Sequence, residues 1–474
     1  MIPVYRELPA DLETPVSAFL KLRSNQPAFL LESVEKGERT GRYSFLACSA
    51  HQVMSTRGDK AVLRRNGVQQ EMNLGKRDAL HLLEEILTGY RAVGYEGLPP
   101  FVGGAVGYLA YDMVRFFERL PEVNRDELNL PDCTFLLTDT MVIFDHVRHS
   151  MKVVSTVPIT GSPSQAYDEA VARIDTVAKV LEGPLPPNEV PRCLPGNGEL
   201  TSNVTVDDFC RKVEVAKEYI AAGDAFQIVL SRRLWRKTSA HGFGIYRALR
   251  RLNPSPYMFY LDLGDFQLIG SSPEVLVKLE GRRASIRPLA GTRRRGANRA
   301  EDDALAAEML ADEKERAEHV MLVDLARNDL GRVCAAGTVK VPVLMDVEKY
   351  SHVMHIVSEV QGDICDGKTA FDVLRASFPA GTVSGAPKIR AMEIITELEG
   401  LRRGPYAGAV GHFGFGGDMD TCIAIRTIVK VGDTVYLQAG AGIVFDSEPV
   451  REHEEVMSKL RALEQAVRDA ECCS

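Results

Sequence analysis

The stretch Ala380-Gly-Thr-Val-Ser-Gly-Ala-Pro-Lys-Ile-Arg390 places small residues beside one hydroxyl, Thr382, and two cations, of which Lys388 is the first. A loop of this composition lets backbone N–H groups wrap a small anion. An apolar helical pattern follows over 389–398, and the N-terminus of such a helix would add to the anion field. The stretch is not a nucleotide P-loop, because its glycines are too close and Pro-Lys replaces Gly-Lys. Taken alone, it is either a helix cap or one wall of an anion site.

The composition is that of a globular protein with room for two or three domains or one two-lobed domain. The chain has 474 residues, 45% of them hydrophobic, and a net charge of −8. Nucleic-acid binding would need a basic patch, and the short run Arg293–Arg295 is the strongest candidate, so we expect no nucleic-acid partner. No apolar run reaches membrane-spanning length, and the N-terminus lacks an apolar signal segment. We therefore expect a cytoplasmic protein with no membrane partner.

The cysteines argue for a reducing compartment. There are nine, an odd number, and none forms a Cys-x-x-Cys pair. Such scattered cysteines are typical of reduced, mostly buried thiols, and a structural zinc site is not expected.

A connector rich in proline and glycine divides the chain. It covers residues 183–200 and separates an N-terminal lobe, 1–182, from a C-terminal part, 201–474. In the N-terminal lobe the pattern predicts helices at 76–87 and 165–181. The C-terminal part opens with an amphipathic helix that Asp207 would cap and Gly223 would end. Strands are expected at Ala28–Leu31, Met141–Phe144, Lys152–Ser155, Ala225–Ser231, Tyr257–Leu263, Gln267–Ser271, Val275–Leu279, His412–Phe415, Cys422–Val431 and Thr434–Gln438. This succession predicts an α+β architecture of layered sheets with helices on the outside, in two lobes.

Two glycine-rich segments echo each other. Phe101-Val-Gly-Gly-Ala-Val-Gly-Tyr-Leu-Ala-Tyr111 is similar to Tyr406-Ala-Gly-Ala-Val-Gly-His-Phe-Gly-Phe415. Each pattern indicates a strand that packs closely against another backbone, and the two lobes could share a substructure.

Two pairs of glutamates stand three residues apart on expected helices. Glu315 and Glu318 form one pair, and Glu452 and Glu455 form the other, with Lys459 one turn later. Two such helices could meet around a hard cation such as Mg²⁺, which prefers oxygen ligands. On spacing alone, two solvated helix faces are the simpler interpretation.

Other candidates for acid–base chemistry are a glutamate after a turn and a pair of histidines. Glu274 ends Ser-Ser-Pro-Glu, where an apolar strand mouth could raise its pKa, although an exposed turn residue is also possible. His352 and His355 lack the glutamate of a zinc-protease helix, so acid–base and structural roles are equally plausible for them.

Together these segments resemble the chorismate-utilising enzymes, most closely the family of anthranilate synthase component I. The resemblance rests on eight segments of the C-terminal part and on Leu30–Ser33 and Gly41–Ser44 of the N-terminal part. The eight segments are Gly223–Ser231, Ser271–Glu274, Arg287–Gly296, Asp312–His319, Leu325–Gly331, Gly381–Lys388, Gly417–Thr427 and Ala439–Val444. The resemblance implies the fold of chorismate-utilising enzymes, of the aminodeoxychorismate synthase type. It also implies a carbon–oxygen lyase that makes anthranilate and pyruvate from chorismate and ammonia, the first step of tryptophan biosynthesis.

The resemblance also implies roles for individual residues. Glu318 and Glu455 would ligate Mg²⁺, supported by Glu315 and Glu452. Glu274 would be the general acid and His355 would serve pyruvate elimination. The remaining residues would hold the substrate's carboxylates, and these are Thr382, Tyr406, Arg426, Gly440, Ala441, Gly442 and Lys459.

Two positions separate the relatives. Family members that add water carry a lysine base where this chain has Gln227, and many aminodeoxychorismate synthases carry a nucleophilic lysine where it has Ala290. A neutral amide cannot activate water and alanine cannot form a covalent adduct, so both residues favour an ammonia nucleophile and anthranilate as product. The alternatives are an aminodeoxychorismate synthase component I of the folate pathway and a non-catalytic tryptophan-binding subunit.

A tryptophan inhibitor site is also implied. Its residues would be Leu31, Glu32, Ser33, Pro256, Tyr257 and Met258, with Glu32 and Ser33 recognising the amino group and the other segment packing on the ring. The chain has no Gly-x-Cys-x-Gly nucleophile segment, so ammonia would come from a separate glutamine amidotransferase subunit or from free ammonium. The positions of Lys388 and Arg390 relative to the anion site stay open.

Overall fold

The computed structural model describes residues 1–24, 26–33, 41–65, 67–90, 92–123, 125–186, 198–350 and 353–472. Most of the predicted connector, together with His352 and two of the cysteines, lies outside these ranges, so the boundary at 183–200 stays a prediction.

Two antiparallel sheets of 12 strands each form the frame. Sheet A runs in the order β1 (Ile2–Pro9), β10 (Ser150–Val157), β9 (Thr140–Asp145), β3 (Tyr43–Ala47), β2 (Ala28–Glu32), β13 (Tyr257–Asp262), β14 (Phe266–Ser272), β23 (Thr427–Val431), β24 (Thr434–Ile443), β12 (Gln227–Lys237) and β11 (Thr201–Ser202), with β20 (Gly385–Ala386) also on β12. Sheet B runs in the order β17 (Leu289–Arg294), β19 (Val353–Asp363), β16 (Arg283–Ile286), β15 (Val275–Glu280), β22 (Met419–Ile423), β21 (Ala409–Gly414), β7 (Gly104–Leu109), β8 (Cys133–Thr138), β4 (Gln52–Arg57), β5 (Lys60–Arg65) and β6 (Val68–Asn73), with β18 (Lys340–Lys349) on β19.

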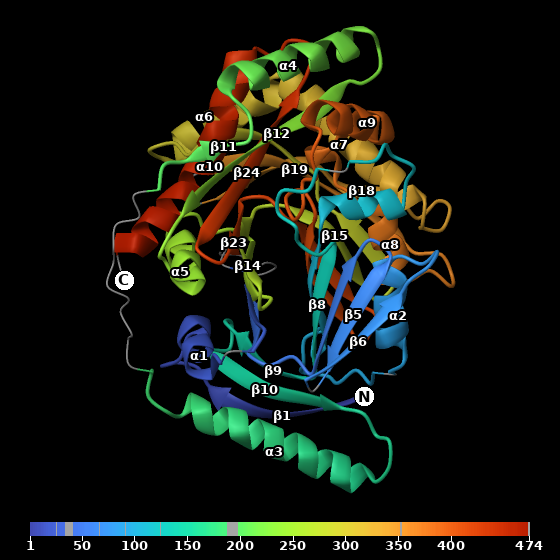
Figure 1. The fold of residues 1–474 in the computed structure, drawn as a ribbon, viewed down its shortest axis with the longest axis vertical. Coiled ribbons are helices and arrows are strands. Elements are labelled where there is room, and N and C mark those ends of the chain that lie inside the picture. The colour runs from blue at the N-terminus through green and yellow to red at the C-terminus, as the bar shows by residue number, and fades with distance from the viewer. Residues whose placement is uncertain are drawn as a thin grey trace.

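Helices cover the outer faces of both sheets, as Figure 1 shows for α10 and α5 on one side and α8 and α2 on the other. The helices are α1 (Pro15–Leu22), α2 (Ala79–Thr88), α3 (Pro163–Leu181), α4 (Val206–Ala221), α5 (Gly242–Leu252), α6 (Arg299–Ala311), α7 (Glu313–Gly331), α8 (Ala370–Ser377), α9 (Lys388–Glu399) and α10 (Pro449–Cys472), with 3-10 turns η1 (Tyr111–Phe116) and η2 (Gly381–Val383). None of the helices in the described ranges is both long and apolar enough to cross a bilayer.

Alternation along the strands separates the core into layers. On β13, Met258 and Tyr260 face the helices on the outside of sheet A, while Phe259 and Leu261 join the core between the sheets. A third core lies between the outer face of sheet B and helices α2, α7 and α8. The α+β prediction of layered sheets with outer helices is confirmed.

Both sheets combine strands from the two sides of the predicted connector. In sheet A, β2 pairs with β13, and in sheet B, β7 pairs with β21. The second pair joins the two glycine-rich segments that echo each other, with Gly107 opposite Gly411. A Cβ on Gly411 would stand 2.1 Å from the carbonyl oxygen of Asp420, so the close backbone approach expected there is confirmed.

Two neighbouring connections carry the chain from one sheet to the other. The turn 273–274 passes from β14 in sheet A to β15 in sheet B, and residues 424–426 pass back from β22 to β23. Backbone hydrogen bonds join the two crossings, from Ile423 N to the Glu274 carbonyl and from Ser271 N to the Arg426 carbonyl. The fold therefore brings Glu274 and Arg426 to the same junction between the sheets.

Three details of the predicted elements were wrong. Helix α4 is capped by Thr205, whose hydroxyl accepts from Asp208 N, because Asp207 already lies in its first turn. The single strand predicted over 422–431 is two strands in different sheets, since Arg426 between them has φ +49°. Strand β12 continues to Lys237, six residues beyond Ser231, where it pairs with the full length of β24.

Candidate active site

Glu274 is a buried carboxyl at the junction of the sheets. Glu274 is only 9% exposed, and its Oε1 accepts a hydrogen bond from Thr382 Oγ1 at 2.9 Å. Burial raises the pKa of Glu274 to about 8, although the hydrogen bond from Thr382 and the positive charge of Lys459 both oppose that rise. The carboxyl is therefore protonated at neutral pH, which is the state of a general acid.

The stretch from Ala380 to Arg390 brings Thr382 to this carboxyl. It forms η2, then β20, whose Gly385 has φ +138° and lies so close to β12 that a Cβ would stand 2.1 Å from the Gln227 carbonyl oxygen. Its two cations turn elsewhere. Lys388 Nζ binds both carboxylate oxygens of Asp329 at 2.8 and 2.9 Å, and Arg390 binds Asp224 and Glu393. Both cations anchor the loop and its helix to neighbouring helices and loops.

His355, on β19, is held as a neutral imidazole. Its Nδ1 lies 2.8 Å from the Gly291 carbonyl, so Nδ1 carries the proton and donates it there. Burial lowers the pKa of His355, and the positive charge of Arg426 lowers it further. The other ring nitrogen, Nε2, is thereby left with a lone pair that can take a proton.

Glu318, on α7, meets Gln227 at the start of β12. Gln227 Nε2 donates to Glu318 Oε1 at 3.2 Å, while Gln227 Oε1 is buried without a hydrogen-bond partner among the described residues. The pKa of Glu318 is raised by burial and by the negative charges of Glu315 and Glu455. A cation between Glu318 and Glu455 would relieve that repulsion, so the oxygen donors present fit a hard divalent ion.

The four glutamates do not form a closed cage. No group of three or more His, Cys, Asp or Glu side chains is gathered for a metal in the ranges that the structure describes. Glu315 accepts an ion pair from Arg293 at 3.0 Å, and burial raises the pKa of Glu452, which also accepts a hydrogen bond from Ser447. Mg²⁺ needs few protein carboxylates because it keeps waters and substrate oxygens, so a site with only Glu318 and Glu455 as protein ligands stays a prediction that this geometry allows.

The arginine run Arg293–Arg295 is neutralised. Arg293 binds Glu315, Glu308 and Asp312, Arg294 binds Glu301, and Arg295 binds Asp302. Each arginine of the run therefore has at least one carboxylate partner close by.

Arg426 and Tyr406 are the two residues predicted to hold the enolpyruvyl carboxylate, and they lie close enough for the charge of each to affect the pKa of the other. Burial lowers the pKa of Arg426, which the charges of Tyr406 and Glu455 oppose, and burial raises the pKa of Tyr406 to about 12. The backbone of Arg426 has φ +49°, a conformation that costs energy for a non-glycine residue and is typical of functional sites.

The glycines of β24 leave room for these groups. A Cβ on Gly440 would stand 2.8 Å from the Tyr406 hydroxyl, and one on Gly442 would stand 2.6 Å from Gln227 Nε2. Ala441 between them is fully buried on the helix side of the sheet, so only its backbone can face the site. Lys459 Nζ donates to the Gly440 carbonyl at 2.9 Å and pairs with Glu455 at 2.6 Å, which links this wall to the candidate metal site.

A separate pocket of about 340 Å³ lies between the sheets, within the size range of small-molecule sites, about 300–1,000 Å³. Its lining includes all six residues predicted for the inhibitor site, Leu31, Glu32, Ser33, Pro256, Tyr257 and Met258. It also includes aromatic residues that the sequence did not single out for this site, Phe45, Phe101 and His412, the last two with ring centroids 4.1 Å apart.

Glu32, which was predicted to recognise the amino group of the inhibitor, already has protein partners in this structure. Both carboxylate oxygens are occupied, since Arg250 donates to each at 2.9 and 3.1 Å and the Tyr246 hydroxyl donates at 2.5 Å. Glu32 therefore anchors α5 to β2. The lining holds three other carboxylates, those of Glu280, Asp418 and Asp420, and Asp420 accepts a hydrogen bond from the Tyr257 hydroxyl at 2.9 Å.

An open groove of about 1,140 Å³ runs past Glu318. Four exposed apolar side chains line it, those of Phe226, Val320, Ile389 and Phe445. Glu318 and Lys314 also line the groove, so the groove reaches the candidate metal site.

The sequence reasoning missed one residue behind the site, Arg403. It is 1% exposed and forms an ion pair with Glu399, four residues earlier. An arginine shortly before Tyr406 with a glutamate one helical turn upstream was the available signal, but nothing in that spacing distinguishes a buried pair from a surface one.

Comparison with known proteins gives a consistent result. A family model described as chorismate binding enzyme matches residues 26–465. Anthranilate synthase component 1 of Acetivibrio thermocellus is 47% identical, covering 99% of this chain and 96% of the relative, and that of Synechocystis is 48% identical, covering 98% and 96%. The crystal structure of anthranilate synthase component I from Streptococcus pneumoniae superposes with a TM-score of 0.78 at 36% identity, covering 96% of this chain and 98% of that one. The isochorismate synthase MenF from Escherichia coli shares the fold, with a TM-score of 0.73 at 19% identity over 98% and 94% of the chains.

Proposed function

This chain belongs to the family of chorismate-binding enzymes, and from that premise we propose that it is the large subunit of an anthranilate synthase. It converts chorismate and ammonia to anthranilate, pyruvate and water, the first step of tryptophan biosynthesis. The observations that carry the proposal are a buried acid, Glu274, whose pKa is raised to about 8 at the sheet crossing next to Arg426, and a base, His355, whose pKa is lowered by burial and by the charge of the same arginine.

The acid and base divide the reaction between them. Ammonia attacks C2 of chorismate while the C4 hydroxyl leaves, and Glu274 donates the proton with which that hydroxyl departs as water. Elimination of pyruvate then restores the aromatic ring, and His355 Nε2 takes the ring proton that this step releases. Their environments set these roles, since burial keeps the carboxyl protonated and burial beside Arg426 keeps the imidazole neutral.

Gln227 favours ammonia as the nucleophile. Its Nε2 is engaged by Glu318, while its buried Oε1 has no partner among the described residues. An unpaired buried acceptor is costly, and an N–H of ammonia would satisfy it. Ala290, which lies opposite Ile356 beside His355, offers no amine for a covalent adduct of the aminodeoxychorismate synthase kind.

Mg²⁺ bound by Glu318 and Glu455 would supply positive charge to the ring carboxylate of chorismate. Arg426 grips the second carboxylate, on the enolpyruvyl group, with Tyr406 beside it and the backbone of Gly440 and Gly442 completing the cradle. Thr382 contributes to acid catalysis as well as to substrate binding, because its hydroxyl holds Glu274 in place.

The purified chain, incubated with chorismate, Mg²⁺ and ammonium, should yield fluorescent anthranilate. Aminodeoxychorismate or isochorismate as the sole product would refute the proposal and favour one of the related activities. Tryptophan binding without turnover would favour the non-catalytic alternative, although such a subunit has no physical need for the acid, the base and the anion holders together.

The groove past Glu318 supports a glutaminase partner. Its apolar lining is suited to cover by another protein, and it leads to the place where ammonia is consumed. Phe445→Ser in this lining should lower glutamine-dependent synthesis in the presence of the partner while ammonium-dependent synthesis is kept. Val68→Ser, which alters an exposed apolar residue on β6, is the matched control. Equal glutamine-dependent rates in the Phe445 variant and the parent would place the partner elsewhere.

The pocket between the sheets is the proposed site of tryptophan inhibition. It encloses Ser33 and the segment 256–258 together with aromatic side chains against which an indole can stack. We place the protein in the cytoplasm, a reducing compartment in which its thiols stay reduced.

A further inference from the structure

Arg403 lies behind the proposed active site, fully enclosed in the protein. Its side chain is 1% exposed and that of its partner Glu399 is 5% exposed, and the two form a bidentate pair, with Nε to Oε2 at 2.8 Å and Nη2 to Oε1 at 2.6 Å. Removing such a pair from water is costly, and packed apolar side chains often serve stability as well. Stability alone therefore does not account for this pair, and the other contacts of the guanidinium point to a second role.

The remaining donors of Arg403 bind the backbone of two segments that carry catalytic groups. Nη1 donates to the Val383 carbonyl at 2.8 Å, and Val383 directly follows Thr382. Nη2 donates to the Val229 carbonyl at 2.7 Å, and Val229 lies on β12 two residues beyond Gln227. One rigid planar group thus fixes the spacing between the Thr382 loop and the Gln227 strand.

Arg403 also contacts a substrate-binding side chain. Its guanidinium lies 5.7 Å from the ring centroid of Tyr406 and 4.6 Å from that of Tyr111. Such cation–π contacts hold an aromatic ring in one orientation. The hydroxyl of Tyr406 reaches Gly440, so the same cation steadies the anion-holding wall.

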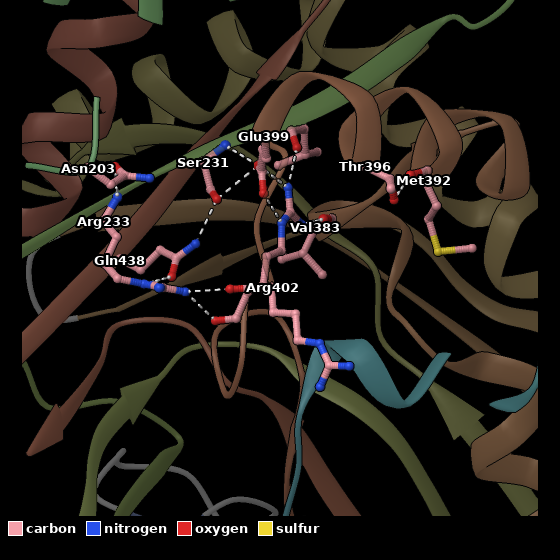
Figure 2. A network of polar contacts seen from close by, with 11 residues as sticks. Asn203, Ser231, Arg233, Val383, Met392, Thr396, Glu399, Arg402 and Gln438 are labelled. Carbon is pink, nitrogen blue, oxygen red and sulfur yellow. Dashed lines mark hydrogen bonds and ion pairs between the residues drawn. The ribbon is translucent and has the colours of Figure 1, made fainter. Parts of the chain in front are cut away.

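The pair is held from behind by a polar network, shown in Figure 2. Glu399 Oε1 accepts from Ser231 N and Oγ, Gln438 Nε2 donates to Ser231 Oγ, and Gln438 Oε1 accepts from Arg233. Arg233 Nη2 then donates to the carbonyls of Arg402 and Arg403. The network returns to its starting residue, so Arg403 has little freedom to move.

We propose that Arg403, locked by Glu399, is the positioning residue of the active site and sets Thr382, Gln227 and Tyr406 at their working distances. Lysine cannot replace it, because a single ammonium cannot reach Glu399, Val383 and Val229 with the geometry of a planar fork. The roles of these three groups rest on the proposed function, whereas their positions do not.

The test compares Arg403→Lys with Arg236→Lys. Arg236, near the far end of β12 from Gln227, forms an ion pair that is also buried, in which its Nη2 binds both carboxylate oxygens of Glu471 and the side chains are 4% and 5% exposed. Both variants should melt at lower temperature than the parent. In Arg403→Lys alone, kcat should fall about 100-fold, the cost of misplacing a reacting group by about 1 Å.

The pH dependence gives a second readout. Loss of the Thr382 hydrogen bond should move the pKa of Glu274 upward, since that bond lowers it. The basic limb of the kcat profile should therefore shift to higher pH in Arg403→Lys, and in the milder Glu399→Gln by a smaller amount, but not in Arg236→Lys. Infrared titration of the protonated carboxyl in the three variants, without substrate, reports the same pKa even if the enzyme makes a different product.

An unchanged kcat and an unchanged Glu274 titration in Arg403→Lys and Glu399→Gln would overturn the proposal. So would the same changes in Arg236→Lys, because any buried pair would then have the effect. If the parent protein forms no anthranilate but the infrared shift of Glu274 is still seen in Arg403→Lys, the proposed function is refuted and the positioning role is retained.

Discussion

Replacing Glu274 by glutamine should abolish turnover and at the same time stabilise the protein at alkaline pH. Glutamine keeps the size of the side chain and an oxygen that the Thr382 hydroxyl can donate to, but it has no acidic proton. The loss of turnover follows from the loss of the general acid. The gain in stability follows from the burial of the carboxyl.

The magnitude follows from proton linkage. The pKa of Glu274 is raised from 4.5 to about 8, so between these pH values the folded state holds a proton that the unfolded state has lost. Each pH unit in that interval costs about 1.4 kcal/mol of the free energy of unfolding. The parent should therefore lose up to about 5 kcal/mol from this one carboxyl as the pH rises from 4.5 through 8, and the loss should be complete above 8. The glutamine variant has no such loss.

The assay is urea unfolding at several pH values, followed by the fluorescence of Trp235, the one tryptophan of the chain, which lies on β12. The difference in free energy of unfolding between Glu274→Gln and the parent should grow steadily from pH 5 to pH 8 and then level off. Glu218→Gln removes an exposed carboxyl on α4 and should show no such growth. A difference for Glu274→Gln that is the same at pH 5 and pH 9 would mean that the carboxyl is ionised in the folded protein, and the general-acid role would be refuted.

Three further predictions concern the other candidate residues. Glu318→Gln and Glu455→Gln should each abolish Mg²⁺-dependent turnover, and near-normal rates in both would contradict the metal site. Ser33→Leu should relieve tryptophan inhibition and leave the uninhibited rate intact, so unchanged inhibition in steady-state assays would remove Ser33 from the inhibitor pocket. Lys388→Met should lower the free energy of unfolding by about 3–5 kcal/mol, because its carboxylate partner Asp329 is left buried and unpaired. Arg390→Met should lower it by only about 0–1 kcal/mol, because the ion pair that it removes is about a third exposed. Equal losses for the two variants on chemical denaturation would contradict this distinction.

Much of the fold could be predicted from local patterns. Alternation and helical periodicity identified most strands and helices of the C-terminal part, because one face of each is buried and the pattern records it. The strand boundary at Arg426 could not be found this way, since an arginine with positive φ is chosen by tertiary contacts and leaves no local signal. The Thr205 cap was missed because threonine and aspartate both favour that position and stand two residues apart.

The stretch from Ala380 to Arg390 shows which features of the site can be predicted from the sequence alone and which cannot. Its composition determined that backbone would be exposed and that Thr382 would offer a hydroxyl, and the order of the motifs determined the family. Which groups face the site was decided by tertiary structure alone. Two sheet crossings place Glu274 against Thr382, Asp329 draws Lys388 away, and Arg403 holds the loop from behind. The physical reason is that the pKa of a carboxyl and the partner of a cation depend on burial and on neighbours remote in sequence, which no local pattern of residues encodes.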